Sequence, residues 1–148
     1  MKKAWLTIIS LLILLPGTAD RVFSETHAAM VKSTSGQVSI LRRDQSVPAR
    51  VGMLLLNGDT IVSAHKGYAG IMFTDGTVIT LGPETDFRIN TYVFSPETGN
   101  YDFFFYLDKG SAVYHSGKIS KLSPESVKVA TPKATVGIRG TRFIIKVD

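Results

Sequence analysis

Residues 69–81 read AGIMFTDGTVITL and hold the clearest structural signal in this chain of 148 residues. Apolar residues alternate on both sides of Asp75 and Gly76, which is typical of two antiparallel strands joined by a tight turn. A two-residue primed turn needs positive φ angles, which glycine adopts freely and aspartate tolerates. The stretch therefore predicts a β-hairpin in which Ile71 and Phe73 share one face.

Turn signals recur every eight to twelve residues on both sides of this hairpin, for example at Lys109-Gly110 and Ser116-Gly117. Alternating or β-branched runs lie between the turns, and no stretch after residue 20 has helical periodicity over two turns. This spacing predicts one all-β domain over residues 34–148, built as an antiparallel sandwich, a jelly-roll-like fold or a β-roll of short strands.

The run YDFFFYL is aromatic on both faces. We expect Phe103, Phe105 and Leu107 to enter the core, which leaves Phe104 and Tyr106 on the opposite face. Two interpretations stay open for that second face. It forms a surface for a partner, or the strand is central in a sheet and covered on both sides.

The N-terminus has the pattern of an export signal. Lys2 and Lys3 precede a twelve-residue apolar stretch, residues 4–15. A helix needs about 20 apolar residues to span a bilayer, so this stretch fits the core of a signal peptide better. We expect a cleaved signal over residues 1–19 and a flexible lead-in over residues 20–33. The alternative is an uncleaved signal anchor, and either would place the body of the protein outside the cytoplasm.

The chain is basic, with 17 Lys and Arg against 12 Asp and Glu. Residues 118–148 hold seven of the basic and two of the acidic residues. Such an end would suit an acidic partner, anionic lipid head groups or envelope polyanions, or would simply form solvated strand faces. An exported protein rarely meets DNA, so we expect no nucleic-acid partner.

Catalytic and metal-binding patterns are missing from the sequence. There is no cysteine, which excludes disulfides, thiolate metal sites and a cysteine nucleophile. The three histidines, His27, His65 and His115, lack the spacing of a metal site. Ser116 follows His115 directly, but neighbouring side chains on a strand point apart. We therefore expect no enzyme, no metal and no cofactor.

The run TPKATVGIRGTRF is the most distinctive segment of the chain. Gly137 and Gly140 bracket Arg139, which indicates a bulge or sharp bend. Under a structural interpretation, Arg139 is tied to a carboxylate. Under a functional one, Arg139 or Arg142 is an exposed contact for an acidic partner. The candidate carboxylates are Asp59 and Asp75.

Four segments, in order, resemble the FecR-domain family, the periplasmic domain of iron-uptake regulators of the anti-sigma-factor type. They are Gly36-Gln37-Val38, LNGDTI at residues 56–61, FTDGTVITLGP at residues 73–83, and Gly117-Lys118-Ile119 together with TPKATVGIRGT at residues 131–141. The motif residues, for which we expect a structural role, are Gly58, Asp59, Asp75, Gly76, Gly137, Ile138, Arg139, Gly140 and Thr141.

The resemblance implies a periplasmic module that senses a signal or binds an envelope protein without catalysis. Only three residues precede the apolar stretch, so we expect no cytoplasmic anti-sigma part and a stand-alone domain. Phe104, Tyr106 and Arg142 are the possible partner contacts. A carbohydrate-binding or cell-wall scaffold is the alternative, and an unrecognised hydrolase is a third hypothesis. The sugar-stacking candidates are Tyr92, Tyr101 and Tyr106.

Overall fold

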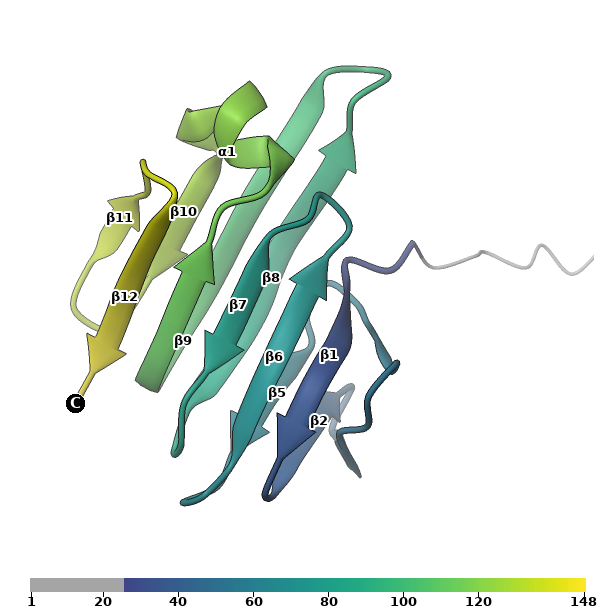
Figure 1. Cartoon of the computed structure of the whole chain (residues 1–148), viewed down its shortest axis with the longest axis vertical. Helices are drawn as coiled ribbons and strands as arrows, with labels where there is room; N and C mark the ends of the chain where they lie inside the picture. Colours follow the sequence, from purple (N-terminus) through teal and green to yellow (C-terminus); the bar gives the residue numbers. More distant parts are fainter. Residues whose placement is uncertain (1–25) are drawn as a thin grey trace, which may run out of the picture.

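A computed structural model describes residues 26–148, which form a single all-β domain, as predicted (Figure 1). A five-residue helix, α1 (Lys118–Leu122), and a 3-10 turn (Pro124–Ser126) follow the longest strand. The strands are β1 (Ala29–Ser35), β2 (Val38–Arg42), β3 (Gln45–Pro48), β4 (Leu54–Leu55), β5 (Thr60–Ser63), β6 (Tyr68–Phe73), β7 (Val78–Leu81), β8 (Asp86–Ser95), β9 (Asn100–His115), β10 (Val127–Ala130), β11 (Thr135–Gly137) and β12 (Arg142–Val147).

One sheet curls over on itself to give two facing layers (Figure 1). Layer A contains β4, β1, β6, β7, the second half of β9 and β12. Layer B contains β3, β2, β5, β8, the first half of β9, β10 and β11. The pairing is antiparallel as predicted, except that β10 lies parallel to β9. The long strand β9 therefore belongs to both layers.

The turn expected at Lys109-Gly110 is wrong, because β9 continues through these residues from layer B into layer A. Gly110 has a φ of 89°, a conformation that favours glycine. A Cβ at this position would lie 2.2 Å from Thr85 Oγ1 and 2.5 Å from Thr85 Cα. Gly110 therefore lets one strand bend between the layers while Thr85 packs against its backbone.

The central hairpin forms between β6 and β7, but its turn differs from the one expected. The carbonyl of Phe73 accepts a 3.0 Å hydrogen bond from Gly76 N–H, and among the turn residues only Gly76 has a positive φ, of 88°. The two-residue turn with two positive φ angles, 46° and 64°, lies instead at Arg43 and Asp44, between β2 and β3. Aspartate tolerates this conformation better than most residues.

The N-terminal boundary of the domain needs a correction. Residues 29–33, which the sequence assigned to a flexible lead-in, form most of β1, with Ala29 and Val31 buried. Strand β1 pairs with β4 and β6, so it is an integral part of layer A. The predicted signal peptide lies outside the described residues. Between residues 26 and 148, no helix has the length and apolar character needed to cross a membrane.

Aromatic side chains from both layers pack together at the centre of a mostly aliphatic core. Phe103, Phe105 and Leu107 are fully buried, which confirms the predicted inner face of β9. The ring of Phe103 lies 4.5 Å from that of Phe73 on β6, and 5.1 Å from that of Tyr92 on β8. The tilted contact with Phe73 joins layer B to layer A, whereas the edge-to-face contact with Tyr92 lies within layer B, and both are preferred geometries for aromatic rings.

Candidate interaction surface

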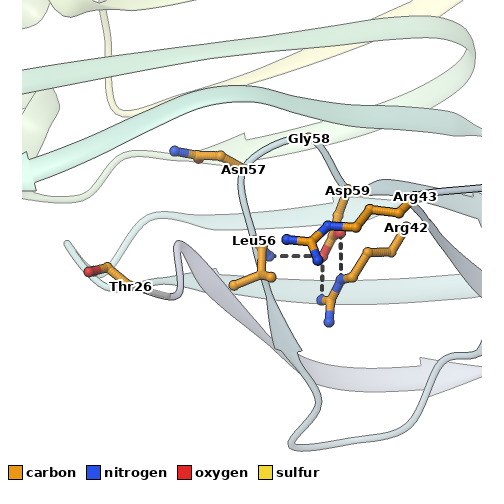
Figure 2. Close-up of a pocket in the computed structure, with 7 residues that line it drawn as sticks. All are labelled: Thr26, Arg42, Arg43, Leu56, Asn57, Gly58 and Asp59. Atoms are coloured by element: carbon orange, nitrogen blue, oxygen red, sulfur yellow. Dashed lines mark hydrogen bonds and ion pairs between the residues drawn. The ribbon is translucent and has the colours of Figure 1, made fainter. Parts of the chain in front are cut away.

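Asp59, at the end of the turn before β5, is buried and paired with Arg42 (Figure 2). Arg42 Nε donates to Asp59 Oδ1 at 2.8 Å, and Arg42 Nη2 donates to Asp59 Oδ2 at 2.6 Å. The Leu56 amide adds a third bond to Oδ2, at 2.8 Å. A two-pronged pair of this kind fixes orientation as well as charge. It holds the turn containing Gly58 against β2.

A cavity of about 270 Å³ lies beside this pair, lined in part by Asn57 and Arg43 (Figure 2). The side chain of Asn57 is used internally, since its Oδ1 accepts from Tyr92 N–H at 2.9 Å and its Nδ2 donates to Tyr92 O at 3.2 Å. Asp59 is likewise saturated by Arg42 and Leu56. These hydrogen bonds hold Asn57 and Asp59 to neighbouring strands.

Asp75 is a second buried carboxylate, 1% exposed, and its oxygens accept four hydrogen bonds. Thr77 donates from N–H at 3.0 Å and from Oγ1 at 2.8 Å. Tyr92 OH donates at 3.1 Å and the Ile119 amide at 3.1 Å. Buried charge is tolerated when hydrogen bonds replace its hydration. Asp75 thus joins the β6–β7 hairpin to β8 and to helix α1.

Gly117 lets the segment after β9 lie directly against the β6–β7 hairpin. A Cβ at this position would lie 2.3 Å from Thr77 N and 2.7 Å from both Asp75 O and Asp75 Oδ2. The Gly117 amide donates to Thr77 Oγ1 at 3.1 Å, and the next amide, of Lys118, donates to Asp75 O at 3.0 Å. The segment after β9 is therefore locked against the hairpin by backbone groups.

Two buried tyrosines border this cluster. Burial raises the pKa of Tyr92 well above its usual value, and the nearby Asp75 carboxylate adds to the effect. Burial also raises the pKa of Tyr114, whose hydroxyl lies 2.6 Å from Ser120 Oγ. Both hydroxyls stay protonated at neutral pH and act as hydrogen-bonding groups within the core.

The glycine-rich segment runs from β11 into β12. Ile138 is 7% exposed and its amide donates to Val127 O at 2.9 Å. Gly140 has a φ of 130°, whereas Gly137 has no positive φ, and Thr141 is exposed with its carbonyl bonded to the Ser116 amide. The bend therefore lies at Gly140.

Arg139 is exposed, and the tie to Asp59 or Asp75 under the structural interpretation is wrong. Asp59 is paired with Arg42, and Asp75 accepts its hydrogen bonds from other groups. Arg139 lies near Glu125 instead. The Ser123 hydroxyl, the backbone of Glu125 and the charge of Arg139 together lower the pKa of that exposed carboxylate.

Phe104 and Tyr106 lie on the outer face of layer B and are half-buried between β8 and β10. Phe104 is in register with Lys128, and Tyr106 donates to Asp108 Oδ1 at 3.3 Å. The strand is thus central and flanked on both sides, and its outer face is still partly open. Arg142 is on layer A, so the structure does not bring it together with these two aromatics.

The three tyrosines considered for stacking on sugar rings differ in how far the structure exposes them. Tyr92 is 6% exposed, so it is wrong as a surface platform. Tyr101 packs against Phe94 with ring centroids 6.0 Å apart, at the rim of the core. Only Tyr106 keeps an outward ring, and a single half-buried ring makes a poor platform.

Two arrangements that would carry chemistry do not form in residues 26–148. His115 and Ser116 share no hydrogen bond within this range, and no group of three or more His, Asp or Glu residues there is placed to hold a metal ion. Both buried carboxylates accept hydrogen bonds from neighbouring groups, and Asp59 also lines the cavity drawn in Figure 2.

The described residues form a two-layer β-domain in which the buried carboxylates Asp59 and Asp75 hold turns and neighbouring elements together. A family model described as FecR protein matches residues 59–148, which run from the Arg42-bound Asp59 to β12. The match covers more than half of the chain, and the chain belongs to the FecR family, a family of regulatory and signalling proteins. The resemblance found in the sequence is confirmed, although Gly36-Gln37-Val38 lies before the matched range. No curated protein and no solved structure matches the chain.

Proposed function

We propose that the chain is exported to the periplasm and acts there as a non-enzymatic signalling module that binds another protein of the bacterial envelope. The family match over residues 59–148 is the observation that carries this proposal. FecR domains are periplasmic, and the lysine-led apolar stretch at residues 4–15 has the pattern of an export signal. The carbohydrate-binding alternative has less support, because Tyr92, one of its three stacking candidates, lies in the core.

Cell fractionation tests the location. Release of the chain by osmotic shock supports a cleaved signal, and sedimentation with the inner membrane together with protease sensitivity in spheroplasts supports the signal-anchored form. Retention in the cytosol would overturn the proposal.

Site-specific photocrosslinking in intact cells tests the binding function. A photoreactive amino acid placed at Phe104, Tyr106 or Arg142 would capture a partner at the surfaces described above. The same amino acid at Thr98, in the exposed turn between β8 and β9, is the control. We expect one or more discrete adducts from the first three positions. Their absence from all three positions would contradict a protein-binding role.

A further inference from the structure

The open edges of the two layers are unequal. Exposed edge strands invite pairing with other chains, and proteins blunt them with short length, proline, bulges or charges. Among the described strands, β4 has two residues, β11 has three, and β3 has four and ends in Pro48. Strand β12 has six residues without proline, and its register with β9 is uninterrupted from Arg142 to Val147. Of the four strands that end the two layers in residues 26–148, β12 is the longest.

The register shows which backbone groups of β12 face outward. Ser116 N–H donates to Thr141 O at 2.9 Å, so the groups of Thr141 point toward β9. Orientation alternates along an antiparallel strand, so those of Phe143 and Ile145 also point toward β9. The N–H and C=O groups of Arg142, Ile144 and Lys146 therefore point away from β9. They offer an unpaired ladder to an incoming strand.

The inner side of β12 is also incompletely covered. Phe143 stacks on Tyr114 with ring centroids 4.5 Å apart, yet Phe143, Ile145 and Val147 are each only half-buried. On the opposite layer, Val136 of β11 is 52% exposed. The two layers thus stay open along the side where β12 and β11 end them. A strand added to β12 would cover inward apolar side chains as well as backbone groups.

The charges on β12 select the kind of strand that would fit. Outward side chains follow the order cation, apolar, cation: Arg142, Ile144 at 68% exposure, and Lys146. Two copies pairing antiparallel through β12, centred on Ile144, would place Arg142 of one opposite Lys146 of the other. Like charges directly opposite destabilise a strand pair. This edge therefore disfavours a second copy and favours a strand with acidic residues at those positions.

We propose that β12 is a docking edge to which an extended segment of a partner protein adds as one more strand, with acidic residues opposite Arg142 and Lys146 and an apolar residue opposite Ile144. This inference rests on the proposed binding function and specifies its surface. Backbone hydrogen bonds supply affinity in such strand addition, and alternate side chains supply specificity.

A labelled peptide of the sequence SEVIVES tests the proposal on the full chain by fluorescence polarisation. Its glutamates can face Arg142 and Lys146 while the central Ile faces Ile144. We expect saturable binding that weakens with added salt. One control peptide has lysine in place of both glutamates, and the other carries an N-methyl group on the central Ile, which removes a ladder hydrogen bond. Binding of either control as tight as that of the parent peptide would overturn the proposal.

Matched variants of the protein test the same edge. Ile144→Pro removes an outward N–H but leaves the bonds to β9, and proline is tolerated at such edge positions. We expect Ile144→Pro to lower the affinity for the parent peptide at least about tenfold, because it removes one backbone hydrogen bond to the peptide and the proline ring keeps the peptide backbone at a distance. Ile144→Val should keep the wild-type affinity. The double variant Arg142→Glu and Lys146→Glu should bind the lysine peptide in preference.

Three further results would overturn the inference. The first is equal binding by wild type and a folded Ile144→Pro variant. The second is no binding of the parent peptide to wild type. The third is a wild-type dimer that Ile144→Pro dissociates, since the edge would then bind a second copy. Crosslinking in cells separates this inference from the proposed function. If the Ile144→Pro variant still forms the adduct, the protein binds a partner but not through β12, and the inference is overturned. If neither the wild type nor the variant forms an adduct, the proposed binding function itself is overturned.

Discussion

Replacement of Asp75 by Asn tests whether a carboxylate joins the central hairpin to the rest of the fold. The two side chains have nearly the same shape, but an amide nitrogen cannot accept a hydrogen bond. Four donors now converge on the two oxygens. The hydroxyls of Tyr92 and Thr77 can turn away, whereas the Thr77 or the Ile119 amide loses its acceptor in either orientation of the new side chain.

A buried donor without a partner costs about 1–3 kcal/mol, and a hydrogen bond to a charged group contributes about 1.5–3 kcal/mol. We therefore expect Asp75→Asn to lower the free energy of unfolding by about 3 kcal/mol, a large part of the total for a domain of this size. Urea titration followed by circular dichroism measures it, and thermal unfolding should shift by roughly 10–15 °C. Hydrogen exchange at the Thr77 and Ile119 amides should accelerate locally.

Asp108→Asn, at an exposed aspartate, is the matched control and should change stability by less than about 0.5 kcal/mol. If Asp75→Asn is as stable as Asp108→Asn and exchanges at the wild-type rate, the carboxylate does not hold these elements together, and the reasoning fails.

Three further predictions concern other buried contacts described above. Gly117→Ala places a methyl group within 2.3–2.7 Å of backbone and carboxylate atoms and should destabilise by about 2–4 kcal/mol in urea titration, whereas Gly137→Ala, with open space around its Cβ, should be nearly neutral. Arg42→Met leaves Asp59 buried without its cation and should cost about 3 kcal/mol in the same assay, and stability equal to wild type would refute the pairing. Because the pKa of Tyr92 is raised, the folded state binds more protons than the unfolded state above the ordinary tyrosine pKa of 10.0. The contribution of this group to the free energy of unfolding should therefore be fully present below about pH 10. At higher pH it should fall by up to about 1.4 kcal/mol per pH unit. Urea titrations between pH 9 and pH 11 measure that slope, which should be shallower in Tyr92→Phe.

Local patterns in the sequence predicted the parts of the fold that depend on local geometry. The alternation around Asp75-Gly76 predicted the β6–β7 hairpin, and the alternation of Phe103 and Phe105 predicted the inner face of β9. These signals depend on side-chain period and turn chemistry, which neighbouring residues encode. The strand pairing that the sequence missed is long-range. Nothing in the run VKVA reveals that β10 lies parallel to β9, because the choice of neighbour depends on the whole chain.

The candidate site shows the same contrast between what local sequence predicts and what depends on long-range contacts. The resemblance pointed to Asp59 and Asp75 as structural residues, but their partners came from elsewhere than expected. Arg42 pairs with Asp59 across 17 residues, and Ile119 binds Asp75 across 44 residues. Arg139, which one of the two interpretations of the sequence tied to these carboxylates, is exposed at the surface. Residue type indicates that a buried carboxylate needs donors, whereas only the folded chain determines which donors reach it.

The strand β9 has a mechanical consequence. Because its sixteen residues run through both halves of the sandwich, a displacement of one half pulls directly on the other along a covalent backbone. A force applied to one layer would therefore reach the other layer through the bend at Gly110, with no further element needed to transmit it.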